Sequence, residues 1–367
     1  MATRGHDPVP LSESLLWEIS DEWPARPFPE ADCGTLRDRW APLLSAQGEG
    51  DPVLVIGPSW DSQLYQVALQ LRVAGTPATV VLTDWPLPPA VAFGPAAAPG
   101  EQQPRSAYLR VTESTCVPFW RDRVVYLADR TPAVLAGQEP LFDLDDAMLR
   151  SWIDSLACPF MVNDPARVSA AQKPKQLRLA AEAGIAVPRT LLTADPQAAA
   201  EHFSGERTVV IKPLASPLLA RQGDTVRMLL PAESGVADLA RRRERLPVAC
   251  FFQERLRPVR EWRVVVVGGE ILAASIHRAD SDAVDWRQAD AGLDSFEAGR
   301  LPEDLARRLL LLTSRLGLAY AAIDLLETAQ RFYFLEANPD GTFAWLERAS
   351  GLRITEAVCR TLVHGKT

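Results

Sequence analysis

The segment Arg331-Phe-Tyr-Phe-Leu-Glu336-Ala-Asn338-Pro-Asp-Gly341 is an apolar run that ends in acid and amide side chains. Because side chains alternate across an extended strand, Glu336 and Asn338 should point to the same side. Asp324 lies near the end of the preceding apolar run, and the short polar segment 327–331 between the runs predicts a hairpin. The hairpin would bring Asp324 beside Glu336.

Two carboxylates and an amide oxygen on one wall are hard oxygen ligands, suited to Mg²⁺ held together with substrate phosphates. The pattern therefore predicts a metal site made by Asp324, Glu336 and Asn338. The alternative is a surface loop with scattered acidic residues. The metal site is favoured, because a strand that looks buried rarely ends in such side chains without a partner.

Composition limits the class of protein. The 367 residues are 47% hydrophobic and 23% charged, an ordinary globular composition with room for two or three domains. The formal net charge of −8 argues against a nonspecific nucleic-acid binder. No apolar run approaches the roughly 18 residues of a membrane-spanning helix, and the N-terminus does not read as a secretory signal. The scattered cysteines and histidines show no metal-ligand spacing. We expect a cytoplasmic protein with no membrane or nucleic-acid partner.

The first part of the chain reads as a small α/β domain, residues 1–158, in which strands alternate with helices. Strands are predicted at 52–56, 78–82 and 123–127, with helices at 64–71 and 144–156. No glycine-rich fingerprint follows the first strand, so no dinucleotide is assigned to it.

The rest of the chain reads as α+β in two further domains, 159–250 and 251–367. Gly268-Gly269 is typical of a hairpin turn, and Pro302 and Gly317 bracket a long amphipathic helix. Further helices are predicted at 172–183, after Pro196, at 235–246 and at 354–363, and further strands at 207–213 and 249–254.

Two lysines stand out beside the predicted metal wall. Lys212 ends a β-branched run and precedes a proline, which keeps it extended, and Lys173 begins a helix. A lysine taken alone is usually a solvated side chain. Together with the metal wall these two gain weight, because ATP phosphates need both cations and Mg²⁺ to neutralise their charge.

These residues and the segments around them resemble those of a known family. Residues from about 160 to 364 resemble an ATP-grasp ligase, most closely the graspetide synthetases (microviridin-type peptide ligases), and more distantly the ribosomal-protein glutamate ligase and glutathione synthetase. The matching segments are Lys173-Pro-Lys-Gln-Leu-Arg-Leu-Ala-Ala-Glu-Ala-Gly-Ile-Ala-Val-Pro-Arg-Thr190, Val209-Val-Ile-Lys212-Pro-Leu, Phe252-Gln-Glu-Arg-Leu, Glu261-Trp-Arg-Val-Val-Val-Val-Gly-Gly, Asp285-Trp-Arg287, Ala322-Ile-Asp324-Leu and Phe334-Leu-Glu336-Ala-Asn338-Pro-Asp-Gly341.

The resemblance implies an ATP-grasp fold behind an N-terminal pre-ATP-grasp α/β domain, with ATP and Mg²⁺ as cofactors. It implies that Lys173 and Lys212 contact the ATP phosphates and that Arg263 and Arg287 face the phosphate or the incoming carboxylate. It further implies a hinge that reads adenine, formed by Gln253, Glu254 and the backbone of Arg255 and Leu256. Glu261 would contact the ribose, and the metal site would be formed by Asp324, Glu336 and Asn338.

Two features leave alternatives open. The triplets that end in Arg263 and Arg287 resemble the acidic-x-Arg elements that these synthetases use around the peptide, but each could be a cross-strand ion pair. Which triplet has which role stays open. The segment 215–223 has one glycine, whereas many ATP-grasp enzymes carry a glycine-rich loop there; this favours the graspetide synthetases over the glutamate ligase.

The function implied is an ATP-dependent carboxylate ligase. It would activate Asp or Glu side chains of a ribosomal precursor peptide as acylphosphates and form side-chain ester or amide macrocycles. The precursor's leader would dock on the central domain, and the resemblance suggests a homodimer. One alternative is a ligase that adds a free amino acid to a peptide, protein or small acid. Another is a non-catalytic module that binds a peptide or nucleotide.

Overall fold

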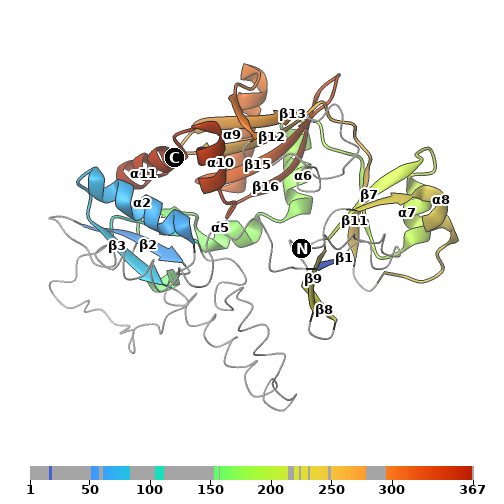
Figure 1. Cartoon of the computed structure of the whole chain (residues 1–367), viewed down its shortest axis with the longest axis horizontal. Helices are drawn as coiled ribbons and strands as arrows, with labels where there is room; N and C mark the ends of the chain where they lie inside the picture. Colours follow the sequence, from blue (N-terminus) through green and yellow to red (C-terminus); the bar gives the residue numbers. More distant parts are fainter. Residues whose placement is uncertain are drawn as a thin grey trace, which may run out of the picture.

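The computed structural model (Figure 1) describes most of the chain from residue 51 onward. The described residues are 16–18, 51–57, 61–82, 104–110, 153–156, 158–213, 219–222, 225–229, 232–246, 249–277 and 295–365.

A parallel four-stranded sheet, in the order β3-β2-β4-β5, forms the N-terminal unit. Its strands and the helix that packs on it are β2 (Val53–Gly57), α2 (Ser62–Val73), β3 (Ala78–Leu82), β4 (Ser106–Leu109) and β5 (Met161–Val162). The side chain of Asp61 caps α2 by accepting from Gln63 N. The predicted strand–helix–strand unit is confirmed for β2, α2 and β3.

The strands and helices predicted for the N-terminal unit agree only in part with those of the structure. The predicted strand 123–127 and most of the predicted helix 144–156 lie outside the described residues. β4 was not predicted, because its four residues carry no readable alternation. β5 pairs with β4, so the first sheet continues past residue 158, where the sequence placed the end of the domain.

The central unit is a four-stranded antiparallel sheet in the order β10-β7-β11-β6. Its elements are β6 (Thr190–Thr193), α7 (Pro196–His202), β7 (Thr208–Pro213), β10 (Ala232–Gly235), α8 (Val236–Arg241) and β11 (Cys250–Glu254). Helices α7 and α8 cover one face and share a core with Phe203 and Phe252. The helix predicted at 235–246 is wrong in its length: it ends at Arg241, because Arg242 is extended.

A smaller three-stranded sheet, in the order β1-β9-β8, accompanies the central unit. Its strands are β1 (Leu16–Glu18), β8 (Leu219–Gln222) and β9 (Thr225–Leu229), all antiparallel to their neighbours.

The C-terminal unit is a five-stranded antiparallel sheet in the order β14-β13-β12-β15-β16. Its elements are β12 (Arg260–Val267), β13 (Glu270–His277), β14 (Glu297–Gly299), α9 (Glu303–Leu316), β15 (Tyr320–Glu327), β16 (Phe332–Asn338), α10 (Ala344–Ser350) and α11 (Ile354–His364). Gly268 and Gly269 have φ of 56° and 82°, so they form the predicted two-glycine turn.

Helices cover both faces of this sheet. On one face lie α9 and two helices from earlier in the chain, α5 (Pro165–Ala170) and α6 (Lys173–Glu182). Thus α5 and α6, which the sequence assigned to a central domain 159–250, pack on the C-terminal sheet. On the other face lie α10 and α11, and this core also takes in Val55 and Leu64 of the N-terminal unit. The N- and C-terminal units therefore share one core, whereas the central unit has its own.

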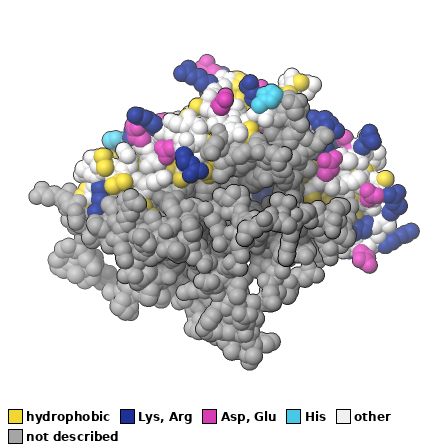
Figure 2. Space-filling model, in the orientation of Figure 1, with side chains coloured by type: hydrophobic (Ala, Val, Ile, Leu, Met, Phe, Trp, Pro, Cys, Tyr) yellow, Lys and Arg dark blue, Asp and Glu magenta, His cyan; other side chains and the backbone are white. Residues whose placement is uncertain are grey.

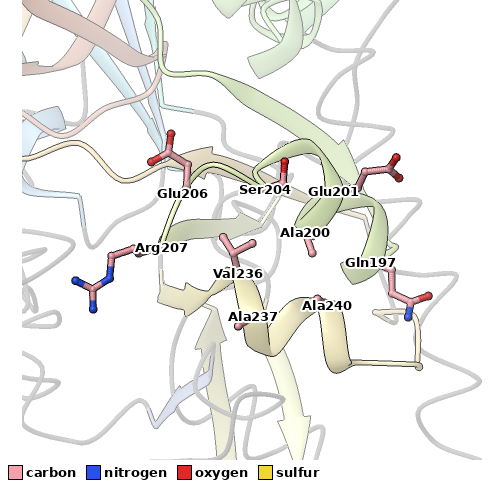
Figure 3. A pocket seen from close by; sticks show the side chains of 9 residues that line it. All are labelled: Gln197, Ala200, Glu201, Ser204, Glu206, Arg207, Val236, Ala237 and Ala240. Atoms are coloured by element: carbon pink, nitrogen blue, oxygen red, sulfur yellow. The ribbon is translucent and has the colours of Figure 1, made fainter.

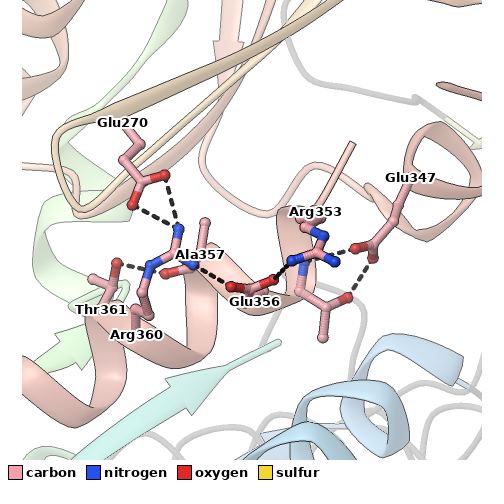
Figure 4. A network of polar contacts seen from close by, with 8 residues as sticks. Glu270, Glu347, Arg353, Glu356, Ala357, Arg360 and Thr361 are labelled. Atoms are coloured by element: carbon pink, nitrogen blue, oxygen red, sulfur yellow. Dashed lines mark hydrogen bonds and ion pairs between the residues drawn. The ribbon is translucent and has the colours of Figure 1, made fainter. Parts of the chain in front are cut away.

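The surface carries charges of both signs. On the face shown in Figure 2, described acidic and basic side chains are interspersed. On α11, for example, Arg360 contacts Glu270 and Glu356, and Arg353 contacts Glu356 (Figure 4). Such exposed pairs contribute little to stability. Within the described part of the chain, no helix is long and apolar enough to cross a membrane.

Candidate active site

The β15–β16 hairpin brings the three predicted metal ligands together. Asp324 lies directly opposite Glu336, and Asn338 lies opposite Ala322. A shift in register after Asp324 interrupts the pairing on the side toward the hairpin turn, so the three polar residues occupy the regular part of the ladder. The predicted hairpin, and the placement of Asp324 beside Glu336, are confirmed.

The amide of Asn338 lies between the two carboxylates. Its Nδ2 donates to Glu336 Oε1 at 3.1 Å and to Asp324 Oδ2 at 3.4 Å. Each carboxylate-bearing side chain is 23% exposed, so this oxygen-lined wall is half-buried but open on one side. Like charges opposite each other on a sheet repel, so such a wall requires cations close by.

Lys173 supplies one of those cations. Its Nζ lies 2.8 Å from Glu336 Oε2. Burial alone would raise the pKa of Glu336, but Lys173, together with Lys212 and the hydrogen bond from Asn338, outweighs burial and lowers that pKa to about 2. The two lysines that the sequence singled out therefore act on the same carboxylate, although they come from α6 and from β7.

Arg263 supplies the other cation. It lies opposite Asp324 on β12, and its guanidinium donates to Asp324 Oδ1 at 2.7 Å. Burial would lower the pKa of Arg263, but Asp324 raises it, so the group stays charged. Its Nε is buried and has no hydrogen-bond partner among the described residues. The ion pair of Arg263 within the described part of the chain is therefore with Asp324.

The central sheet has a second face, opposite the one that α7 and α8 cover. Val209 and Ile211 point into the core beneath α7 and α8, so by alternation Lys212 points to the opposite face. Phe251 pairs with Lys212, and Gln253, two residues further, shares that face. Gln253 is 5% exposed and donates to Thr190 Oγ1 at 3.0 Å.

The rest of the predicted hinge has partners of its own. Glu254 Oε1 accepts from the backbone N–H of Arg189 at 2.8 Å. Arg255 pairs with Glu233 at 3.1 Å and also donates to the carbonyl of Leu256 at 2.9 Å. The side chains of Glu254 and Arg255 therefore bind neighbouring protein groups. The backbone groups of this segment are the ones that could contact a ligand.

Of the two acidic-x-Arg triplets, the structure describes the one that ends in Arg263. Glu261 is half-buried and lies two residues before Arg263 on the same face of β12. Trp262, between them, is 6% exposed and packs in the core below α9. Asp285 and Arg287 lie outside the described residues.

Sequence reasoning missed a buried glutamine that joins the helix of Lys173 to β16. Gln176, one turn later on α6, is 3% exposed. Its amide exchanges two hydrogen bonds with the backbone of Ala337, each 2.8 Å long, as a neighbouring strand would. The available signal was a glutamine on the side of α6 that carries Leu179 and Ala180, where an apolar residue is expected.

One open pocket lies away from this constellation. It has a volume of about 700 Å³ and lies between α7 and α8 (Figure 3), on the side of the central sheet opposite Lys212. The residues that line it are Gln197, Ala200, Glu201, Ser204, Glu206, Arg207, Val236, Ala237 and Ala240. Among the described residues, no group of three His, Cys, Asp or Glu is placed to hold a metal by itself. A metal at the wall would therefore need Asn338 and ligand oxygens as well.

Comparison with solved structures identifies the fold. A ligase described as RiPP-associated ATP-grasp, from Chryseobacterium gregarium and in complex with ADP and a leader and core peptide, aligns with a TM-score of 0.69 and 18% identity, over 86% of this chain and 98% of its own. The macrocyclase MdnC from Microcystis aeruginosa MRC, bound with precursor peptide MdnA, aligns with a TM-score of 0.67 and 23% identity, over 85% and 99%.

The ATP-grasp ligase PsnB, complexed with a phosphomimetic variant of minimal precursor, Mg and ADP, aligns with a TM-score of 0.68 and 22% identity, over 87% of this chain and 99% of its own. At these identities the likeness shows the fold, and it confirms the predicted ATP-grasp architecture. No curated protein matches the chain.

A family model supports the same assignment from sequence. The model described as RimK-like ATP-grasp domain matches residues 170–362, which is more than half of the chain. The matched range holds both lysines, Arg263 and the whole oxygen-lined wall. The chain therefore belongs to the RimK-like ATP-grasp family and is an ATP-dependent ligase.

Proposed function

We propose that this ligase activates Asp or Glu side chains of a ribosomal precursor peptide and joins them to other side chains of the same peptide as ester or amide macrocycles. The observation that carries the proposal is the half-buried wall of Asp324, Glu336 and Asn338, with the cations of Lys173 and Arg263 within 2.8 Å of its carboxylates. A wall of this kind suits the meeting of several anions.

The donor set fits Mg²⁺. Two carboxylates and an amide are hard oxygen ligands, and the depressed pKa of Glu336 keeps that carboxylate ionised at neutral pH. Asp324, Glu336 and Asn338 would hold the metal, which would neutralise phosphate charge when bound. Lys173 and Lys212 would bind the ATP phosphates. Gln253, Glu254 and the backbone of Arg255 and Leu256 would read adenine, and Glu261 would hold the ribose.

The chemistry has two displacements. A peptide carboxylate attacks the γ-phosphate of ATP and gives an acylphosphate and ADP. A hydroxyl or amine then attacks the acyl carbon and expels phosphate. Arg263, which pairs with Asp324 at the wall, would orient the phosphate or the carboxylate, and Arg287 would share this task. Holding the anions close together while cancelling their repulsion is the protein's contribution.

The substrate class rests on the solved neighbours. Each of the three structures compared above is a ligase or macrocyclase determined with a precursor, or with leader and core peptide, and the chain aligns with at least 98% of each. We propose a precursor peptide as the partner here, with its leader bound to the central unit. The family match favours a second candidate, a ligase that adds a free amino acid to a peptide, protein or small acid.

Mass spectrometry separates the candidates. The protein is incubated with ATP, Mg²⁺ and a precursor peptide encoded beside its gene. Macrocyclisation makes the peptide lighter by one water per ring, whereas amino-acid addition makes it heavier by one residue. No mass loss with any neighbouring peptide would refute the macrocyclase proposal. A non-catalytic module would release no ADP in response to the peptide, so ADP is measured in the same reaction.

A further inference from the structure

The turn that follows Asn338 is held from outside by three side chains. Asn163 donates to the carbonyl of Pro339 at 2.8 Å, Arg110 donates to the carbonyl of Asp340, and Tyr320 Oη donates to the carbonyl of Gly341 at 2.6 Å. The three donors are 3%, 6% and 3% exposed, respectively. Three successive carbonyls are thus fixed by buried groups that follow β4 and β5 and that begin β15, which leaves this turn little freedom.

Arg110 comes from the N-terminal unit, and that unit holds it rigidly. Its Nε donates to Asp61 Oδ2 at 2.7 Å, and the two side chains are 7% and 6% exposed. Asp61 also caps α2, and in the first turn of that helix the side-chain oxygen of Gln63 accepts from the backbone N–H groups of Phe343 and Ala344. The N-terminal unit therefore holds the chain after Asn338 at two points.

The position of this turn bears directly on the oxygen-lined wall. A Cβ on Gly341 would clash with Ala322, would lie 2.8 Å from the guanidinium of Arg263 and would lie 3.3 Å from Cβ of Asn338. The turn is therefore in close contact with one proposed metal ligand and with the arginine that pairs with another. A displacement of the Asp340 carbonyl would reach both groups, because packed side chains transmit shifts.

The chemistry of the contact favours a role in positioning over one in stability. A buried ion pair is often no better for stability than apolar side chains of the same volume. Asp61 and Arg110 instead provide direction, because the guanidinium reaches a carboxylate with one nitrogen and a carbonyl with another.

We propose that Arg110, held by Asp61, is a positioning residue of the active site. It fixes the turn 339–341 from the N-terminal unit and so sets the geometry of Asn338 and Arg263. This inference rests on the proposed metal role of the wall. Through this turn the N-terminal unit would support the proposed metal ligands indirectly.

The test compares binding of ADP with and without Mg²⁺ by calorimetry, which needs no turnover. Arg110→Lys keeps the charge beside Asp61 but cannot bridge the carboxylate and the carbonyl in the same way. We expect the variant to bind ADP in EDTA as the wild type does, and to bind ADP with Mg²⁺ about 10-fold more weakly, as is common when a group supporting a metal ligand is lost. Arg72→Lys, in the same unit but bonded to the Ala78 carbonyl, is the matched control.

A second variant guards against misfolding. The pair Asp61→Asn with Arg110→Met removes both charges together, which avoids leaving one of them buried alone. It should show the same Mg²⁺-specific loss, together with faster amide hydrogen exchange in the turn 339–341. Equal weakening with and without Mg²⁺, or unchanged binding in both variants, would overturn the inference. If Mg²⁺ does not improve ADP binding by the wild type, both this inference and the proposed metal wall fail.

Discussion

The two sides of the candidate active site are built differently. The oxygen-lined wall lies on a sheet whose core is continuous with that of the N-terminal unit, and the turn after it is held by Asn163, Arg110 and Tyr320. Lys212 and Gln253 lie on the central sheet, which has a separate core. The difference indicates that the proposed metal side is preorganised, whereas the proposed nucleotide side belongs to a unit with its own core.

The largest expected effect comes from breaking the wall itself. Glu336→Gln keeps the shape of the side chain but removes its charge, so neither Lys173 nor a divalent cation finds a carboxylate there. We expect peptide-stimulated ADP release to fall on the order of 100-fold, similar to the loss of a direct transition-state contact. The measurement is a coupled ADP assay with saturating ATP.

The control for this variant is Glu356→Gln, which alters a half-exposed carboxylate on α11 that contacts Arg353 and Arg360. It should leave ADP release unchanged. Wild-type ADP release by Glu336→Gln would show that the metal assignment is wrong.

The wall could be predicted from sequence because its signals are local. Alternation placed Glu336 and Asn338 on one side, and a polar turn brought Asp324 beside them. The two lysines gained weight from the predicted wall, whereas Arg263 was given a role only by the resemblance to a family. The contact from Arg110 to the turn spans 230 positions in the chain and has no local pattern at either end.

The strands β4 and β5 were also not predicted, because they too carry no local pattern. β4 and β5 have four and two residues, too few for periodicity to appear, and their pairing extends the first sheet past the predicted boundary. The packing of α6 on the C-terminal sheet depends on Gln176 meeting the Ala337 backbone, which a helical pattern alone does not reveal. Contacts between residues far apart in the sequence therefore determine the extent of the first sheet and the packing of α6.

The next largest effect is expected from crowding the rigid side. In Gly341→Ala the new methyl group would meet Cβ of Ala322, which cannot move without the strand backbone, and would also meet the guanidinium of Arg263. Overpacking of this kind costs about 1–3 kcal/mol, so the free energy of unfolding in urea should fall by that amount. Gly205→Ala is the matched control, because nothing lies within 4 Å of the added atom. Equal stability of the two variants would mean that the turn is not tightly held.

A smaller effect should follow from loosening the link between α6 and β16. Gln176→Ala leaves Lys173 in place but removes the two hydrogen bonds that fix its helix to Ala337. Because Lys173 is proposed to bind phosphate, we expect the KM for ATP to rise about 10-fold while the protein stays folded. Gln172→Ala, an exposed glutamine one residue before α6, should not change KM. If both variants behave alike, Gln176 has no positioning role.

The smallest effect concerns the electrostatics that join the two sides. Glu336 faces Lys173, Lys212 and the amide of Asn338, with Asp324 opposite, and its pKa is lowered to about 2. A carboxylate with a lowered pKa in the folded state adds stability above its ordinary pKa of 4.5, and this stability is lost as the pH falls toward about 2.

Removing Lys173 should therefore raise the pKa of Glu336 and flatten this dependence. We expect wild-type protein in EDTA to lose about 1 kcal/mol more of its free energy of unfolding than Lys173→Met between about pH 5 and pH 3.5. Lys175→Met, on the same helix, is the control and should follow the wild type. If Lys173→Met loses as much as the wild type, Lys212 and Asn338 lower the pKa without it. Lys212 of the central unit would then contribute to the charge of the wall, and the contrast between the proposed metal side and the proposed nucleotide side would weaken.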